Sequence, residues 1–175
     1  MSAQAAEPGA VVLGHAHVQL EAKGSLADAK RFDRSMGGAG LVAGVVSARQ
    51  GVPTALVTRV GEDALTPWML ETWEAAGLHL DFVRRVPGAN PLVLCGDEPR
   101  EEPLVWSEGA ACSGIDSSDV DTIPWDLATV LFVPGTLQAL GPGPRAAARY
   151  ALDLGLAKLR DDADCEQGQL TAAGE

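Results

Sequence analysis

The sequence predicts an α/β protein with a mostly parallel sheet and a small second β layer beside it. Four short apolar runs are typical of buried strands: residues 10–13, 52–60, 78–83 and 129–133. Runs with helical spacing lie between them, and this alternation is expected of parallel strands joined by crossover helices. Polar segments at about 19–35 and 90–108 do not fit inside such a sheet. We expect these two segments to pair with each other as a lid.

The first predicted helix covers residues 38–50 and begins at a turn crowded with glycines, Gly37, Gly38 and Gly40. Glycine lets a backbone approach a ligand closely, and a helix N-terminus presents free N–H groups with partial positive charge. The turn is therefore a candidate binding element.

A second helix is predicted over residues 65–76, with Asp63 placed to accept hydrogen bonds from its first N–H groups and Gly77 placed to end it.

The remaining elements follow from turn and capping signals. Residues 91–95 and 103–106 flank an acidic turn, the pattern of a hairpin. A third helix is predicted over 144–159, with Pro144 near its first position. Outside the domain at residues 10–159, we expect a flexible leader at 1–9 and a disordered acidic tail at 160–175, because neither has an apolar period.

Bulk composition excludes several classes of function. The 175 residues carry a net charge of −11, which disfavours nucleic acid as a partner. The sequence has no run of about 18 apolar residues, so we expect no membrane span. Its three cysteines, Cys95, Cys112 and Cys165, are far apart and odd in number, which argues against a disulfide scaffold and favours a cytoplasmic location.

Two other site types fit the sequence less well. Residues 38–43 match the dinucleotide-binding pattern G-x-G-x-x-A, but the residues before them are charged and do not form the required buried strand. His15 and His17 could share one face of a strand as metal ligands. Only His79 remains elsewhere, so ordinary strand-end histidines are the simpler interpretation and we expect no metal site.

Taken in order, the motifs resemble those of the ribokinase-like (PfkB) carbohydrate kinases. Gly37-Gly38 followed by Ala48-Arg49-Gln50-Gly51 is close to the family pattern G-G-x-x-x-N-x-A-x-x-x-A-R-L-G, and residues 60–63 resemble its V-G-x-D. Weaker matches follow at residues 75–78, 82–88, 109–111 and 131–135. The resemblance covers roughly residues 10–157.

The resemblance implies a three-layer α/β/α core, truncated, with a small β lid. It implies a sugar or sugar acid held between the lid and the sheet, with Gly37 and Gly38 as substrate-binding residues. For the full-length family it also implies ATP and Mg as cofactors and phosphoryl transfer to a sugar hydroxyl. The lid often forms a dimer surface in this family, so a homodimer through the lid is a further expectation.

The chain departs from the family pattern at its functional positions. The catalytic G-A-G-D motif and the ATP site belong to the C-terminal half of the family, and the motif does not occur here, so we identify no catalytic or cofactor-binding residue. Val42 stands where the family has its sugar-binding asparagine, and Gln19 stands where it has an aspartate. The predicted function is the N-terminal half of a sugar kinase that is inactive alone. The alternative is a non-catalytic descendant that binds a ligand or self-associates.

Overall fold

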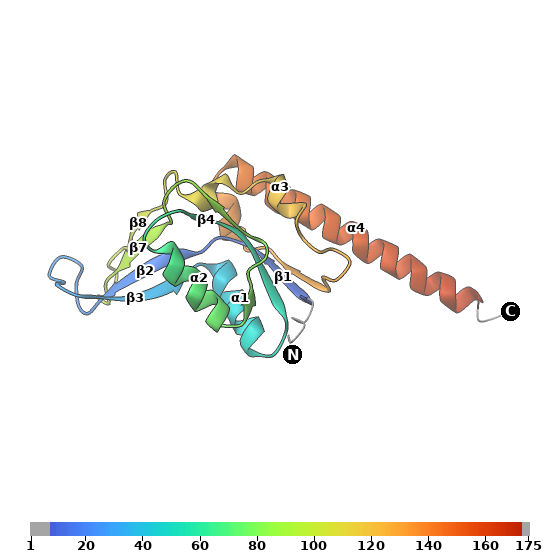
Figure 1. Ribbon diagram of the computed structural model, residues 1–175, viewed down its shortest axis with the longest axis horizontal. Helices are drawn as coiled ribbons and strands as arrows, with labels where there is room; N and C mark the ends of the chain where they lie inside the picture. The colour runs from blue at the N-terminus through green and yellow to red at the C-terminus, as the bar shows by residue number, and fades with distance from the viewer. Residues whose placement is uncertain (1–7, 173–175) are drawn as a thin grey trace.

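The computed structural model of the protein describes residues 8–172, with side chains described through residue 158. The predicted leader therefore falls mostly outside the described residues. The described chain forms a central sheet, helices on both faces of that sheet, and a separate lid sheet (Figure 1).

The central sheet is parallel throughout, as the alternation of strands and helices predicts. Its order is β5 (Leu78–His79), β4 (Thr54–Gly61), β1 (Ala10–Leu13) and β9 (Val130–Phe132), and β6 (Val83–Val86) also pairs with β4. The strand predicted at residues 78–83 is two strands in the structure. The chain turns between them, with the N–H of Val83 donating to the carbonyl of Leu80 at 2.9 Å, so β5 and β6 pair with different halves of β4.

Successive side chains of the strands point to opposite faces of the sheet, and this alternation produces the three layers. Val11 and Leu13 point into a buried cluster with the helices α3 (Ser117–Val120) and α4 (Pro142–Ala172). Val12, between them, points into the opposite cluster with α1 (Ala39–Arg49) and α2 (Thr66–Ala75). Because successive strand side chains face opposite sides, one apolar strand supplies both cores of a doubly covered sheet. Two 3₁₀ turns, η1 (Ala111–Gly114) and η2 (Gly135–Leu140), complete the layer on the α4 side.

The lid is a second, four-stranded sheet with the order β3 (Phe32–Gly37), β2 (His17–Ala22), β7 (Leu92–Cys95) and β8 (Leu104–Trp106). The two polar segments of the sequence therefore pair with each other, as expected. Strands β2 and β7 are parallel, and each is also paired with an antiparallel neighbour. In Figure 1 the lid lies at one end of the molecule, and α4 extends away from the opposite end.

The last predicted strand is less buried than its apolar sequence suggests. Val130 and Phe132 of β9 are 56% and 41% exposed, so the expectation of a buried strand is wrong for this element. The cause is tertiary: β9 is the edge of the sheet, and among the described residues only β1 pairs with it.

Helix α4 is longer than its sequence predicts. It starts at Pro142 and continues to Ala172, whereas the sequence favours a helix over 144–159 and disorder from residue 160. Residues 160–172 include three aspartates and Gly168, which are poor helix formers, so intrinsic propensity does not account for the extension. Residues 173–175 lie outside the described residues. No helix in the described part of the chain combines the length and the apolar character needed to cross a membrane.

Candidate functional site

The glycine turn, Gly37 to Gly40, joins the lid to the central domain. Gly37 is the last residue of β3, and Gly38 is the N-cap of α1 with φ 112° and ψ 126°. The carbonyl of Gly38 accepts from the N–H of Val42 at 2.9 Å, which starts the helix. The turn therefore directs the remaining free N–H groups of the first helical turn toward the lid side of α1.

Close backbone packing explains why glycines occupy this turn. A Cβ placed on Gly40 would lie 3.0 Å from the Cα of Gly14 at the end of β1. A Cβ on Gly38 would lie 2.5 Å from the carbonyl oxygen of His15. At Gly37 an added Cβ would overlap the ring of His17. The turn therefore packs directly against residues 14–16, which connect β1 to the lid.

A row of polar side chains runs along β2 beside the turn. His17, Gln19 and Glu21 alternate along the strand, so they share one face of the lid. Glu21 accepts hydrogen bonds from the side chain of Gln19 at 3.1 Å and from the hydroxyl of Ser35 at 2.5 Å. This polar row was not identified from the sequence as a site, although its period of two residues was a usable signal.

The two histidines of this region are held in the neutral form. Burial lowers the pKa of His15, and the neighbouring His17 lowers it further. Burial also lowers the pKa of His17, against a smaller raising effect of its hydrogen bond with Gln19. The rings stack with centroids 6.2 Å apart. A neutral imidazole has one donor and one acceptor, which suits a hydroxyl-bearing ligand better than an anion.

A hollow of about 480 Å³ continues along the lid from this row, lined by residues that include Glu21, Lys23 and Asp33. Gly37 and Gly38 are not among the lining residues, so they lie at one end of the polar row rather than within the hollow. The structure brings the glycine turn, the histidine pair and Gln19 together. Val42 is close in sequence, and its side chain is 51% exposed on α1.

The V-G-x-D segment forms a hydrogen-bonded link between the sheet, α2 and the lid. Asp63 accepts from the N–H groups of Leu65 at 2.9 Å and Thr66 at 3.2 Å, as its predicted capping role requires. It also accepts from the backbone N–H of Asn90 at 2.7 Å and from its side chain at 2.9 Å. Asn90 in turn accepts from the N–H of Gly61 at 2.9 Å. The role of Asn90, which lies two residues before the start of β7, was missed from the sequence.

A second polar cluster fixes α3 against the sheet. Arg59 of β4 contacts Asp119 and Asp116, each at 2.8 Å, and Arg84 lies 3.3 Å from Asp119. Burial would lower the pKa of Arg59, but the hydrogen bonds and charges of the two aspartates outweigh it and raise the pKa. Asp119 is 3% exposed and also closes the capping box of α3 with Asp116.

The lowered pKa values of Asp116 and Asp63 predict that the protein loses stability in acid. A hydrogen bond from the hydroxyl of Ser118, followed by one from Arg59, lowers the pKa of Asp116 to about 2. Partial burial would raise the pKa of Asp63, but the hydrogen bonds from Asn90, Leu65 and Thr66 lower it. A lowered folded-state pKa stabilises the protein above the unfolded value of about 3.9, and this stabilisation is lost as the pH falls through the folded value.

We expect the free energy of unfolding, measured in urea, to fall between pH 4 and pH 2. Asp116→Asn should flatten that fall because it removes one of the titrating groups. Parallel pH profiles for the two proteins would contradict the prediction.

The other candidate residues do not assemble into a site. His79 lies on β5, at the edge of the sheet opposite β9, away from the histidine pair on the lid side. Within the described residues, no group of three or more His, Cys, Asp or Glu side chains could hold a metal ion. Cys112 is buried, and burial raises the pKa of its thiol to about 11, which makes it unreactive at neutral pH.

Comparison with known proteins identifies the family. Residues 8–99 match the model of the pfkB family carbohydrate kinases, and this range is more than half of the chain. The chain belongs to the pfkB family. The matched range contains β1, the polar row of the lid, the glycine turn and the Asp63 link.

Solved structures agree with this assignment at the level of the fold. A PfkB protein from Polaromonas sp. JS666 superposes with a TM-score of 0.78 and 24% identity, covering 86% of this chain and 52% of the other. Halothermothrix orenii fructokinase superposes with a TM-score of 0.74 and 20% identity, and the match covers 85% of this chain and 53% of the fructokinase. A sugar kinase from Pyrococcus horikoshii in complex with ATP superposes with a TM-score of 0.68 and 19% identity, and the match covers 82% of this chain and 47% of that kinase.

The pfkB-family chain therefore spans about half the length of the structures that it matches. The α/β architecture expected from the sequence, a mostly parallel sheet with a small β lid, is confirmed and matches the fold of these kinases.

Proposed function

We propose that this chain supplies the sugar-facing N-terminal half of an ATP-dependent sugar or sugar-acid kinase and does not transfer phosphate alone. The observation that carries the proposal is the coverage of the solved kinases, 86% of this chain against 52% of the first of them. This half would bind the sugar before the reaction. Phosphoryl transfer would need the half that the match leaves uncovered.

The polar row and the glycine turn support a role in sugar binding. Gly37 and Gly38 place backbone at the lid side of α1, and the neutral rings of His15 and His17 can each donate and accept one hydrogen bond. The Nδ1 atom of His15 is buried and has no hydrogen-bond partner among the described residues. An unpaired buried polar atom costs about 1–3 kcal/mol, so His15 would contribute to sugar binding only in a conformation that opens this atom to a ligand hydroxyl.

We expect no ATP site at the start of α4. A nucleotide phosphate would need free N–H groups there, but α4 begins with Pro142, Gly143 and Pro144, and the two prolines have no N–H. The ammonium of Lys158 contacts the carbonyl oxygens of Trp125 and Ala128 and is not free for a phosphate. The sequence also has no G-A-G-D motif, whose aspartate would take the proton of the attacking hydroxyl.

A coupled ATP-turnover assay with a panel of sugars and sugar acids tests the proposal. The purified chain is expected to show no turnover above the background of a heat-denatured sample, with or without added Mg. Turnover that tracks the purified protein across chromatography fractions would overturn the proposal.

The second candidate is a non-catalytic descendant that keeps a ligand site. Val42 and Gln19 favour this candidate, because they stand where the family has an asparagine and an aspartate. The lack of the family's C-terminal motifs does not explain these two replacements. Two lost hydrogen bonds of about 1–3 kcal/mol each would weaken sugar binding by roughly a hundredfold or more. Calorimetry tests this candidate: micromolar affinity for a sugar or nucleoside would support a retained ligand site.

The lid offers a surface for self-association. Its edge strand β8 exposes Leu104, Val105 and Trp106 at 50%, 57% and 53%, and an unpaired apolar edge strand can pair with a second chain. A homodimer through the lid is therefore part of the proposal, in a cytoplasmic setting favoured by the odd number and wide spacing of the cysteines. Light scattering should report a dimer that Val105→Lys converts to a monomer.

A further inference from the structure

The polar row of the lid is a chain of hydrogen-bonded side chains that ends at a free carboxylate oxygen. His17 forms a hydrogen bond with Gln19, and the side-chain N–H of Gln19 donates to Oε1 of Glu21 at 3.1 Å. The hydroxyl of Ser35 donates to the same oxygen at 2.5 Å. In the described part of the chain, no hydrogen bond or ion pair involves Oε2 of Glu21, and this residue is exposed. Side chains held in this way lose little conformational freedom on binding, so Oε2 is a pre-oriented acceptor.

The row is longer than a single sugar ring. His17 lies opposite Gly37 in the pairing of β2 with β3, and Glu21 lies opposite Asp33. A strand rises about 3.4 Å per residue, so the carboxylate of Glu21 lies roughly 13 Å along the strand from the glycine turn. A ligand that contacts both ends of the row must therefore extend beyond one ring.

The hollow of about 480 Å³ that continues from Glu21 suits a neutral polyhydroxy group. Its lining includes three cationic and three carboxylate side chains, whose formal charges cancel: Lys23, Lys30 and Arg31, with Glu21, Asp28 and Asp33. A hydroxyl group accepts hydrogen bonds from ammonium and guanidinium groups and donates them to carboxylates. An ion of either sign would instead meet as many like charges as opposite ones.

Hydrogen bonds from a neighbouring loop fix the segment that forms one wall of the hollow. The N–H of Gly24 donates to the carboxylate of Asp97 at 2.8 Å, and the N–H of Leu26 donates to that of Glu101 at 2.9 Å. These bonds join the loop between β2 and β3 to the loop between β7 and β8. The hollow is therefore largely formed before a ligand arrives.

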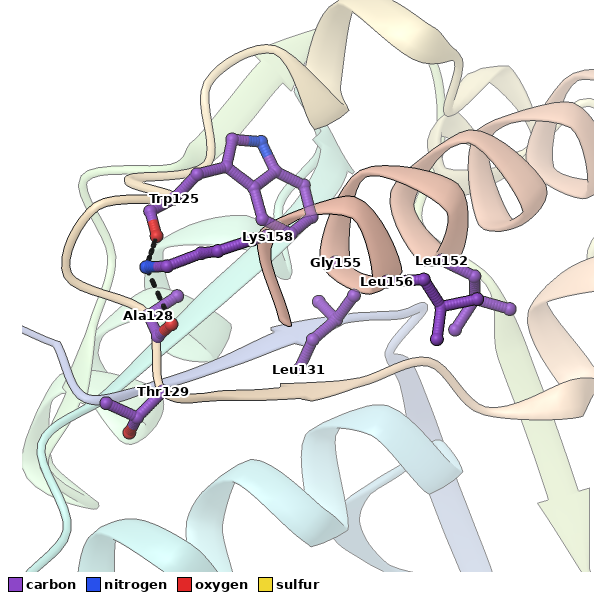
Figure 2. A pocket seen from close by; sticks show the side chains of 8 residues that line it. All are labelled: Trp125, Ala128, Thr129, Leu131, Leu152, Gly155, Leu156 and Lys158. Atoms are coloured by element: carbon purple, nitrogen blue, oxygen red, sulfur yellow. Dashed lines mark hydrogen bonds between the residues drawn. The ribbon is translucent and has the colours of Figure 1, made fainter. Parts of the chain in front are cut away.

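A groove of about 320 Å³ between β9 and α4 does not suit such a ligand. Its lining is mainly apolar and includes Leu131, Leu152 and Leu156 (Figure 2). The ammonium of Lys158 beside these side chains contacts two backbone carbonyl oxygens. A sugar placed there would lose hydrogen bonds with water and find few partners, so the hollow of the lid is the better site for a polyhydroxy group.

We propose that Glu21 and the hollow form a distal subsite for a second sugar unit, so that the ligand of this chain is a di- or oligosaccharide. The first unit lies at the glycine turn, and the second occupies the hollow and donates a hydroxyl hydrogen bond to Oε2 of Glu21. This inference rests on the proposed function and narrows its substrate class from sugars and sugar acids to neutral sugars of at least two units.

Matched pairs of sugars test the proposal on the purified full chain. The pairs are glucose and maltose, galactose and lactose, and fructose and sucrose, with gluconate as a sugar acid. Calorimetry is expected to show that the disaccharide of at least one pair binds at least tenfold more tightly than its monosaccharide. In nuclear magnetic resonance spectra of the isotope-labelled chain, the amide signals of residues 28–33 should shift with that disaccharide and not with the monosaccharide.

Three variants locate the second unit. Glu21→Gln keeps one oxygen for Gln19 and Ser35 but replaces the free carboxylate oxygen, so the affinity ratio of disaccharide to monosaccharide should fall at least fivefold. Ala29→Trp places a large side chain in the hollow and should lower the same ratio. The control Glu74→Gln changes an exposed carboxylate on α2 and should leave the ratio unchanged. Thermal melts verify that each variant remains folded.

Three results would overturn the distal subsite. They are equal affinities within every pair, no detectable binding of any of the sugars, and tighter binding of gluconate than of every disaccharide, which would mean that the hollow takes an anion. The proposed function fails separately, through ATP turnover by the chain alone, so the two failures are distinguishable.

Discussion

Gly38→Ala is expected to lower the free energy of unfolding by about 4 kcal/mol, a large part of the roughly 5–15 kcal/mol of a typical domain. Two costs add at this position. The backbone angles of φ 112° and ψ 126° are rarely adopted by a residue with a Cβ, and such strain costs about 1–3 kcal/mol. The new Cβ would also lie 2.5 Å from the carbonyl oxygen of His15 and 3.1 Å from the Cα of Ala16, and backbone atoms cannot move aside cheaply.

Gly51→Ala is the matched control for this prediction. Gly51 has φ 84°, but an added Cβ there meets nothing within 4 Å. Only the backbone strain remains, so a loss of about 1–2 kcal/mol is expected. Urea denaturation of the three proteins measures the difference. Equal losses in the two variants would show that the seating of the turn on residues 15 and 16 contributes nothing to stability.

Arg59→Met is expected to cost about 3–4 kcal/mol, because it leaves the buried carboxylate of Asp119 without its closest cation. Arg84 remains 3.3 Å away, but its side chain is 41% exposed and its charge is better screened by water. The loss should appear as a lower urea midpoint with an unchanged slope, since the folded state keeps its compactness.

Two further variants test the cause of that loss. R59M/D119N keeps an oxygen for the capping box of α3 while removing the buried charge, so it should recover about 1–2 kcal/mol relative to R59M. Lys23→Ala removes the ion pair with Asp33, whose side chains are 90% and 78% exposed, and should change stability by less than about 0.5 kcal/mol. No recovery in the double variant would mean that lost packing of Arg59, and not the stranded charge, is responsible.

The local elements were largely predictable. Residues 10–13 form β1 and residues 54–61 form β4, close to the predicted runs, because four or more consecutive apolar or β-branched residues have few other soluble conformations. The hairpin of β7 and β8 and the end of α2 before Gly77 also follow from turn chemistry that acts over a few residues.

The candidate site was predictable only in part. Gly37 and Gly38 were identified because glycine spacing is visible in the sequence, and their role in substrate binding remains a prediction. The partners that surround them come from elsewhere: His17 reaches Gly37 through strand pairing, and Asn90 reaches Asp63 across 27 positions of sequence. Such pairings depend on the register of whole strands, which one sequence does not specify.

The sequence by itself determined β1, β4, the first two helices, the glycine turn and the membership of the pfkB family, because each depends on short-range periodicity or on a motif that is contiguous along the chain. The tertiary structure alone decided the exposure of β9, the register of the lid strands and the burial of Asp119. These three depend on which elements become neighbours, and whether an apolar or charged side chain is covered is a property of its neighbours and not of its own residue type.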